Sequence, residues 1–516
     1  MIGKKGTETM LHELEIRMLP GEAWWGGLVN CGYRMPLTQQ SRCTVDPFGG
    51  EDLDQGAPVF LSSKGRCISS GKGFVLSAED GVIRCRGEEE IRLEALGSDL
   101  RSAYLAASQK YFPFSGGLPD ERFFSRPQYN TWIELGTNQT TEAILTYARS
   151  ILADGLPAGI LMIDEGWQEE YGVFEFNRRK IPDPRALMDG LHAMGFAVML
   201  WVTPVIACAG PRFRELCARE YLLKDGKKQI ALRTWWNGTS AVLDLTNDGA
   251  CAWLHAQLHS LMERYGVNGF KLDAGDRYFY RDDDATCRPT TAREHTTLFN
   301  RIGETYALNE FRSAWNFGGR PIVARLQDKK HNWDTDGLST LIPNTIVQGL
   351  MGYAYCCPDM VGGGEMGSFE RGEPLDGELF VRWAQASACM GMMQMSISPW
   401  RVLPKEQAVL VSDALKLHAS LAERICALAE HAAKTGEPIV RHMAYVFPDQ
   451  GYETVNDQFM LGDTLLVCPV LKKGAAKRRV RLPAGNWASW RGEVFEGPAD
   501  VELDVTLADL PRFERL

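Results

Sequence analysis

Residues 158–164 read AGILMID, residues 196–204 read FAVMLWVTP, and residues 267–273 read VNGFKLD. Each stretch is a short apolar run without strict polar–apolar alternation, which is typical of parallel strands buried on both faces. A helical stretch separates each run from the next, and residues 248–266 show the pattern with a polar start and a glycine at the end. Repeated strand-and-helix units predict an α/β fold with a parallel sheet.

The same alternation continues toward the C-terminus of the chain. Apolar runs at residues 320–326, 353–357 and 392–396 are separated by further helical stretches. We count some eight strand-then-helix units between residues 126 and 436, which predicts a (β/α)8 barrel, the TIM barrel fold. An open doubly wound sheet would carry a glycine-rich phosphate loop after its first strand, and none is present.

The sequence changes character on both sides of the barrel. Residues 1–125 contain short strand-like runs between polar turns, such as APVFLSS at 57–63 and GVIRCRG at 81–87. We therefore expect an N-terminal β-sandwich over residues 1–125. Strand and turn signals return in residues 437–516, which predict a small C-terminal β-domain.

Composition and charge exclude several classes of function. The chain of 516 residues has 56 Lys and Arg against 66 Asp and Glu, a net charge of −10, which argues against nucleic acid or an anionic membrane as the main partner. No apolar run is long enough to cross a bilayer. The start of the chain has two lysines with no apolar segment behind them, so we expect no secretory signal. The 13 cysteines, an odd number in mostly apolar settings, predict free thiols and a cytoplasmic protein, with a homo-oligomer left open.

Carboxylates follow two of the predicted barrel strands, at the end where such barrels hold their active sites. Gly269, Lys271 and Asp273 share one face of a strand, so a lysine and an aspartate point inward. Asp164 ends another strand, with Trp167 just beyond, and a carboxylate beside an aromatic ring suits a sugar. The alternatives are a buried structural Lys–Asp pair and an aspartate that caps a short helix.

A third segment could supply a second carboxylate. Arg325 ends a predicted strand, and the loop behind it holds Trp333, Asp334 and Asp336. Alone this loop would be read as solvated surface, but with the first two segments it indicates two opposed carboxylates, the arrangement of glycoside hydrolysis. No His or Cys spacing typical of a metal site is present, so we expect neither a metal nor an organic cofactor. Other aromatic and acidic residues near predicted strand ends add to the case for a carbohydrate pocket: Trp132, Trp201, Trp235, Trp236, Asp244 and Asp359.

These segments resemble glycoside hydrolase family 31, and the similarity extends over most of the chain. The matching stretches, in the family's order, are AWWGGLVNCGYRMPL (23–37), MIDEGWQ (162–168), GFKLDAGD (269–276), HNWDTDG (331–337), PDMVGG (358–363), ELFVRWAQ (378–385) and QFMLGDTLLVCPV (458–470). Within the family the sequence is most similar to the myogenesis-regulating glycosidase-like branch, which the resemblance associates with α-galactosidase activity.

The resemblance implies roles for individual residues. Asp273 would be the nucleophile, and Asp336 the general acid/base, with Asp334 as the alternative because the loop is shorter than in the family's α-glucosidases. Asp164 and Arg325 would bind the sugar, and Asp276 would support the nucleophile. We expect Lys271 and Arg325 to keep Asp273 ionised, while burial and that negative charge raise the pKa of Asp336. The remaining expected substrate-binding residues are Lys271, Trp167, Trp201, Trp333, Trp25, Trp236, Asp359 and Ser396.

One departure from the family pattern bears on the substrate. The family's α-glucosidases have an arginine and a sugar-contacting histidine after the 378–385 helix, whereas this chain has the run Met393 to Ser396. The expected function is therefore a retaining α-glycoside hydrolase that releases a terminal hexose, with α-galactose favoured, from an oligosaccharide or other α-glycoside. The alternatives are an α-glucosidase or α-xylosidase, a glycosyltransfer enzyme using the same two steps, or a non-catalytic carbohydrate-binding homologue.

Overall fold

The computed structural model describes residues 11–48, 55–370 and 375–516. Residues 1–10, on which the expectation of no secretory signal partly rests, lie outside this part of the chain. All 13 cysteines lie within it and are free thiols. Among the described residues, no helix combines the length and apolar composition that crossing a membrane requires.

The centre of the protein is a ring of parallel strands. The first seven strands each pair with their neighbour in the sequence, and the eighth pairs with the first. An additional parallel bridge between Met360 and Gln394 joins the ends of the sheet. The (β/α)8 barrel is thus confirmed. Its strands are β9 (Gln128–Asn130), β10 (Ile160–Ile163), β13 (Ala197–Val202), β17 (Gly269–Leu272), β18 (Leu308–Phe311), β20 (Val323–Arg325), β21 (Cys356–Cys357) and β22 (Gln394–Met395).

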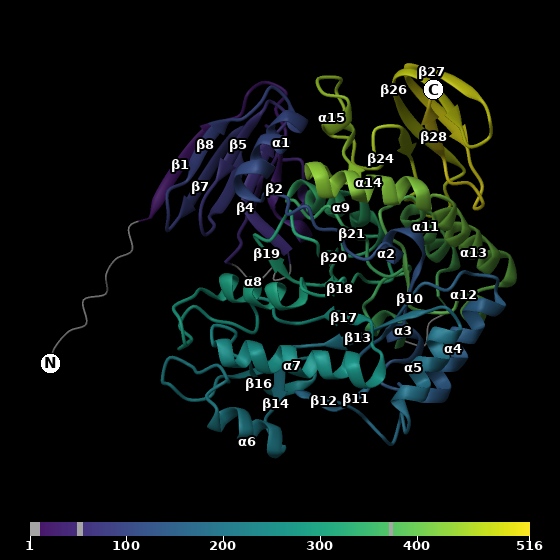
Figure 1. Ribbon diagram of the computed structural model, residues 1–516. Coiled ribbons are helices and arrows are strands. Elements are labelled where there is room, and N and C mark those ends of the chain that lie inside the picture. Colours follow the sequence, from purple (N-terminus) through teal and green to yellow (C-terminus); the bar gives the residue numbers. More distant parts are fainter. Residues whose placement is uncertain (1–10, 49–54, 371–374) are drawn as a thin grey trace.

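Helices follow every barrel strand except β18, which is joined to β20 through a short strand, and they cover the ring (Figure 1). Side-chain caps begin several of them: Thr140, Asp183 and Thr291 each accept a hydrogen bond from a backbone N–H in the first turn. The longest ends at Gly266, whose φ of +83° suits a residue without a Cβ. The main helices are α4 (Thr141–Ala153), α5 (Pro184–Ala193), α7 (Asp248–Tyr265), α8 (Ala292–Gly303), α9 (Leu341–Leu350), α11 (Gly377–Ala388), α13 (Lys405–Ser420) and α14 (Ala422–Thr435).

None of the apolar runs predicted from the sequence covers strand β18. Its residues are LNEF, and the two polar ones interrupt the run. Both are fully buried because they have partners: Asn309 donates to the backbone oxygen of Tyr306 (2.7 Å), and Glu310 accepts from Gln394 (2.7 Å). A strand with buried polar side chains therefore cannot be recognised by its apolar residues alone.

Small additions extend the loops of the barrel. A hairpin, β11 (Gln168–Glu170) and β12 (Val173–Phe176), follows β10. After β13 the chain forms a three-stranded sheet of β14 (Val205–Ala207), β16 (Gly238–Val242) and β15 (Leu232–Trp235), with α6 (Gly210–Ala218) between. Short helices complete the connections: η1 (Val29–Arg34), α2 (Arg122–Ser125), α3 (Trp132–Leu135), η2 (Leu338–Thr340), α10 (Gly367–Glu370), α12 (Pro399–Val402) and α15 (Met443–Val446).

The N-terminal region holds two sheets, as expected, and also the helix α1 (Leu100–Tyr111), which we did not predict. One sheet has the order β1 (His12–Arg17), β7 (Val82–Gly87), β6 (Val75–Glu79), β3 (Cys43–Val45). The other has the order β19 (Ala314–Trp315), β4 (Gln55–Ser62), β5 (Arg66–Ser69), β8 (Arg92–Ala95), and β2 (Trp24–Leu28) pairs with β4. Because β19 follows β18, a barrel loop is part of the N-terminal sheet.

The C-terminal region is one antiparallel sheet with its own small core. In the view of Figure 1 this sheet (yellow) and the N-terminal sheets (purple) both lie above the barrel. Its order is β23 (Val440–Arg441), β24 (Phe459–Leu461), β25 (Leu465–Val467), β28 (Arg512–Arg515), β26 (Lys477–Ser489) and β27 (Val494–Asp504).

Candidate active site

Asp273 follows the last residue of β17 and is held from three sides. Trp201 of β13 donates its indole N–H to Oδ2 (2.8 Å), and the backbone N–H of Ala274 donates to Oδ1 (2.8 Å). Arg312, just beyond β18, places Nε 2.7 Å from the same Oδ1. The side chain keeps 13% of its surface exposed. A fixed carboxylate thus stands partly open at the C-terminal end of the barrel.

Charge keeps this carboxylate ionised. Burial alone would raise the pKa of Asp273, but the positive charges of Arg312, Lys271 and Arg325, with the hydrogen bond from Trp201, outweigh burial and hold the pKa well below its usual range. The sequence predicted Lys271 and Arg325 as the sources of this effect. Arg312 contributes more than either and was not predicted.

Asp164 and Lys271 form a buried ion pair beside the nucleophile candidate. Lys271 Nζ lies 2.6 Å from Asp164 Oδ2, and both side chains are buried. Burial opposes the charge of Lys271, but Asp164 and other carboxylates raise the pKa of its ammonium above the usual value. The two residues come from neighbouring parts of the barrel, since β10 and β17 both pair with β13.

Arg325, at the end of β20, is fully buried and forms ion pairs with three carboxylates. Its guanidinium lies 2.6 Å from Asp328, 2.8 Å from Asp359 and 3.3 Å from Glu310. Asp359 is fully buried, with φ +71°, and accepts from the backbone N–H groups of Lys329 and Gly364. Burial raises the pKa of Asp359 to about 6, although Arg325 opposes the shift.

The end of β22 presents no imidazole. Gln394 Nε2 donates to Glu310 (2.7 Å) and Gln128 (3.1 Å) inside the barrel. Ser396 is buried, and its hydroxyl oxygen accepts from the backbone N–H of Ile133 (2.9 Å). Both side chains are therefore used in holding β22 and α3 in place, which does not support a direct sugar contact for Ser396.

A second carboxylate, Glu165, lies next to Asp164. It accepts hydrogen bonds from the Tyr171 hydroxyl and from the Asn237 amide. Burial raises the pKa of Glu165, and the charges of Asp164 and Asp273 add to the shift. Asn237 lies in the turn between β15 and β16, so the three-stranded addition reaches across to the β10 end of the barrel.

The same turn places Trp236 at the site. Its indole is 51% exposed and lies 5.0 Å from the Arg312 guanidinium, in a cation–π contact. Since Arg312 also pairs with Asp273, an exposed aromatic face stands close to the nucleophile candidate. Of the predicted aromatic residues, Trp201 thus donates a hydrogen bond to Asp273, and Trp236 contacts Arg312, the ion-pair partner of Asp273.

Asp336 lies in a different setting. It belongs to the loop of residues 326–337 that follows β20, and its side chain is 49% exposed. Lys330 Nζ lies 2.7 Å from one carboxylate oxygen, and Asn332 donates to the other (2.6 Å). These two contacts hold the pKa of Asp336 below its usual value. The expectation that burial raises this pKa is therefore wrong, because the loop leaves the carboxyl half exposed beside a lysine.

Three other predicted tryptophans are engaged elsewhere. Trp167 is fully buried, packs on Phe176, and donates to the backbone oxygen of Trp201 (2.8 Å). Trp25 is buried against His442. Trp333 is half-buried and donates to Asp376 (3.0 Å), the capping residue of α11. The predicted sugar contacts of Trp167 and Trp25 are therefore wrong, because a buried ring offers no face to a ligand. The segment that holds Trp25 contacts the loop of residues 326–337 through a hydrogen bond from Asn30 to Gln327.

Sequence reasoning missed Arg312, Glu310, Glu165, Tyr171 and Asn237. A signal existed for the first two, since Glu310 and Arg312 are two residues apart and share one face at the end of a strand. Glu165 and its two partners gave none, because the contacts join three separate loops. Within the described ranges, no group of three or more His, Cys, Asp or Glu side chains could hold a metal ion.

Comparison with known proteins matches both the barrel and the C-terminal sheet. Residues 128–424 match the Glycosyl hydrolases family 31 TIM-barrel domain, and residues 436–515 match the Glycosyl hydrolase family 31 C-terminal domain. Myogenesis-regulating glycosidase of Mus musculus is 30% identical over 96% of this chain and 74% of its own length. SITS-binding protein of Tetronarce californica is 30% identical over 54% of this chain and 41% of its own length.

A solved structure agrees with the fold. The Flavobacterium johnsoniae GH31 dextranase FjDex31A, complexed with glucose, superposes with a TM-score of 0.85 at 19% identity, over 100% of this chain and 67% of its own. The family domains match more than half of the chain, and the relatedness to myogenesis-regulating glycosidase extends over nearly all of it. This chain therefore belongs to glycoside hydrolase family 31.

Proposed function

We propose that the chain is a retaining α-glycosidase that releases a terminal hexose, with α-galactose favoured over glucose and xylose. The observation that carries the proposal is the ionised Asp273, fixed by Arg312 and Trp201 at the open end of the barrel. A carboxylate that is ionised, oriented and partly exposed is what attack on an anomeric carbon requires.

Two displacement steps follow from this arrangement. Asp273 attacks the anomeric carbon, and the carboxyl of Asp336 gives its proton to the departing glycosidic oxygen, which leaves a covalent glycosyl-enzyme. Water then attacks the same carbon and Asp336 takes its proton, while the bond between that carbon and Asp273 breaks; the Asp273 carboxylate is restored and the sugar departs with its α configuration retained. Retention requires the two carboxyl groups to lie about 5–5.5 Å apart when substrate is bound.

The acid step needs a protonated Asp336, and Lys330 opposes its protonation. A sugar that displaces water from the loop would remove solvent from this carboxyl and raise its pKa. In this proposal Asp336 gains its proton when substrate binds, whereas Asp273 is already ionised before substrate binds.

Two observations support galactose. The end of β22 offers Gln394 and Ser396, both engaged within the protein, where the resemblance leads us to expect a sugar-binding histidine in an α-glucosidase. A missing donor leaves the hydroxyl that it would pair with poorly satisfied, which costs about 1–3 kcal/mol of binding; the loss favours galactose over glucose where that hydroxyl is the equatorial 4-hydroxyl of glucose, since the two sugars differ only at C4. The relative that matches nearly the whole chain carries the name myogenesis-regulating glycosidase, and the resemblance associates that branch with α-galactosidase activity.

A panel of nitrophenyl α-glycosides tests the substrate. We expect kcat/KM for the galactoside to exceed that for the glucoside and the xyloside, and NMR during the first turnovers to show the α-anomer of the released sugar. A higher value for the glucoside or xyloside would replace the substrate assignment and leave the mechanism intact. Early β-anomer would overturn retention itself.

A non-catalytic carbohydrate-binding protein is the second candidate, because Asp336, the proposed acid, is half exposed and its pKa is held below the usual value. A mechanism-based epoxide separates the two. Covalent addition, seen as a mass increase, supports the enzyme; full occupancy of the pocket by a reversible sugar with no mass increase supports the binding protein.

A further inference from the structure

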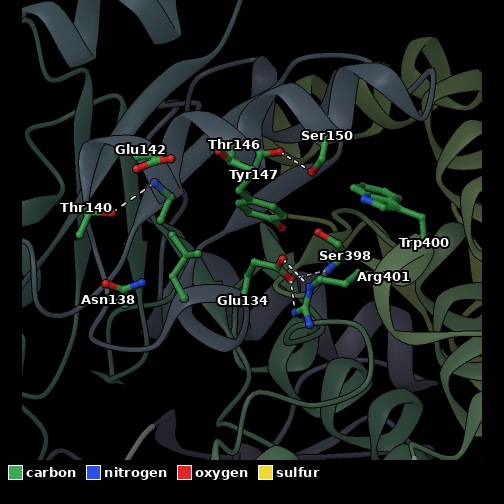
Figure 2. Close-up of a pocket in the computed structure, with 12 residues that line it drawn as sticks. Glu134, Asn138, Thr140, Glu142, Thr146, Tyr147, Ser150, Ser398, Trp400 and Arg401 are labelled. Carbon is green, nitrogen blue, oxygen red and sulfur yellow. Dashed lines mark hydrogen bonds and ion pairs between the residues drawn. The ribbon is translucent and has the colours of Figure 1, made fainter.

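A pocket of about 550 Å³ lies on the rim of the barrel, lined by residues that the proposed reaction does not use. Its walls come from α3, α4 and α12 (Figure 2). Because α3 follows β9 and α12 follows β22, and these strands are neighbours, the pocket lies at the barrel end that also holds Asp273. Its size fits one sugar ring with water around it.

Two aromatic side chains define the inner part of the pocket. Tyr147 of α4 is buried, and its ring stands at the centre of the view in Figure 2. Trp400 of α12 is half-buried and stands at one side. Tyr147 therefore forms part of the wall, whereas Trp400 keeps surface exposed at the pocket, and an exposed aromatic face suits the C–H face of a hexose.

An ion pair ties the segment that carries Trp400 to α3. Glu134 of α3 accepts from Arg401 Nε (2.9 Å) and Nη2 (2.8 Å), and from the backbone N–H of Ser398 (2.8 Å). These two residues lie on either side of Trp400 in the sequence, so the backbone of α12 at Trp400 is anchored to α3. A backbone anchored before a ligand arrives loses little conformational freedom on binding.

The outer part of the pocket is polar. Asn138, Glu142 and Thr146 are exposed there, and Thr140 caps α4 beside them. An amide, a carboxylate and hydroxyl groups can pair with sugar hydroxyls. Arg401 balances the charge of Glu134, and Glu142 adds a negative charge, which disfavours an anionic ligand.

We propose that this pocket is a second, non-catalytic binding site for one neutral hexose unit of a glycan. Its occupant stacks on Trp400 and hydrogen-bonds to the polar outer part. The site would hold a glycan on the rim while another of its residues reaches the barrel centre. The proposal does not depend on catalysis at Asp273, since it concerns binding alone.

Calorimetric titration of the Asp273→Asn variant with raffinose, isomaltotriose and maltotriose tests it. We expect a second binding event for at least one of the three sugars, which Trp400→Leu weakens at least tenfold and Trp400→Phe retains. The kcat/KM of the otherwise wild-type Trp400→Leu enzyme for a nitrophenyl glycoside should stay within twofold of wild type, because that substrate is too small to reach both sites.

A second variant guards against loss of folding. Thr146→Arg on the exposed face of α4 places a long side chain at the mouth of the pocket, and Val409→Arg on exposed α13 is the matched control. We expect only Thr146→Arg to remove the second event. One binding event for all three sugars, or a second event that survives both Trp400→Leu and Thr146→Arg, overturns the proposal. Neither result would contradict the glycosidase proposal, because that proposal is tested separately by measuring turnover.

Discussion

The two carboxylates of the proposed reaction stand on different kinds of support. Asp273 extends from the end of a barrel strand, where an indole, a backbone N–H and a guanidinium fix it, and nearby cations lower its pKa. Asp336 lies in a loop, half exposed, where Lys330 and Asn332 hold it. Both have lowered pKa values, yet only a low value suits a nucleophile, and an acid needs a raised one.

The difference separates what the scaffold supplies from what the substrate must supply. Groups on strands are positioned by the sheet, so the nucleophile and the Asp164–Lys271 pair are set before a ligand arrives. A loop carboxyl takes its environment from whatever lies beside it, and half-exposed Asp336 lies beside Lys330 and Asn332. Substitutions of the strand groups and of the loop groups should therefore differ in how much activity they remove and in whether they change the rate or its pH dependence.

The largest effect is expected on the strand side. Asp273→Asn keeps the shape of the side chain and removes the nucleophile, so kcat on a nitrophenyl glycoside should fall by about 10³-fold or more. Circular dichroism and thermal unfolding should match the wild type. If the purified variant retained more than a few per cent of turnover, Asp273 would not be the nucleophile.

On the loop side, the leaving group decides the size of the effect. Asp336→Ala should lower kcat/KM by about 10²–10³-fold for an alkyl glycoside, which needs a proton, and far less for a dinitrophenyl glycoside, which needs none. Asp334→Ala is the matched control and should change both substrates alike and little. The reverse pattern would assign the acid to Asp334.

Arg312 tests what keeps the nucleophile ionised. Arg312→Gln removes the largest positive contribution, so the pKa of Asp273 should rise and the acid limb of kcat/KM should move to higher pH, with a rate loss of about 10–100-fold at neutral pH. Arg320→Gln, which removes a more exposed arginine beside Glu304, should leave the profile unchanged. An unmoved acid limb would contradict the role given to Arg312.

The smallest effect is expected at Lys330. Because Lys330 lowers the pKa of Asp336, Lys330→Gln should raise that pKa and extend the protonated acid to higher pH. The basic limb of the pH profile for kcat/KM should move upward, with little change at the optimum. Lys477→Gln, which breaks another exposed lysine–carboxylate pair, is the control. A basic limb that shifts downward, or equally in both variants, would remove Asp336 as the titrating acid.

The sequence predicted the parts that depend on regular strands. Asp164, Lys271 and Asp273 follow from period-two alternation at the ends of two apolar strands, and the structure places them together. The strand of Glu310 was missed because its polar residues are satisfied by others across the barrel, such as Gln394. Hydrogen bonds between strands far apart in the sequence cannot be predicted from either strand alone.

The parts that depend on loops could not be predicted in the same way. Trp167 follows a strand end as a sugar platform would, yet its ring is buried, since the turn after β10 directs it into the core. Trp236 and Asn237 reach the site from an added sheet, and nothing in their own segment shows which barrel loops they meet. Side-chain direction in a loop is set by tertiary contacts rather than by local periodicity.

The central claim is that Asp273 forms a covalent bond with the sugar. Treatment with a 5-fluoro-α-galactosyl fluoride should slow turnover of the glycosyl-enzyme enough to trap it, and peptide mass mapping should then find the added mass on Asp273. A label on Asp164, Glu165 or Asp336, or turnover of the reagent with no trapped intermediate and with inversion of configuration, would contradict it.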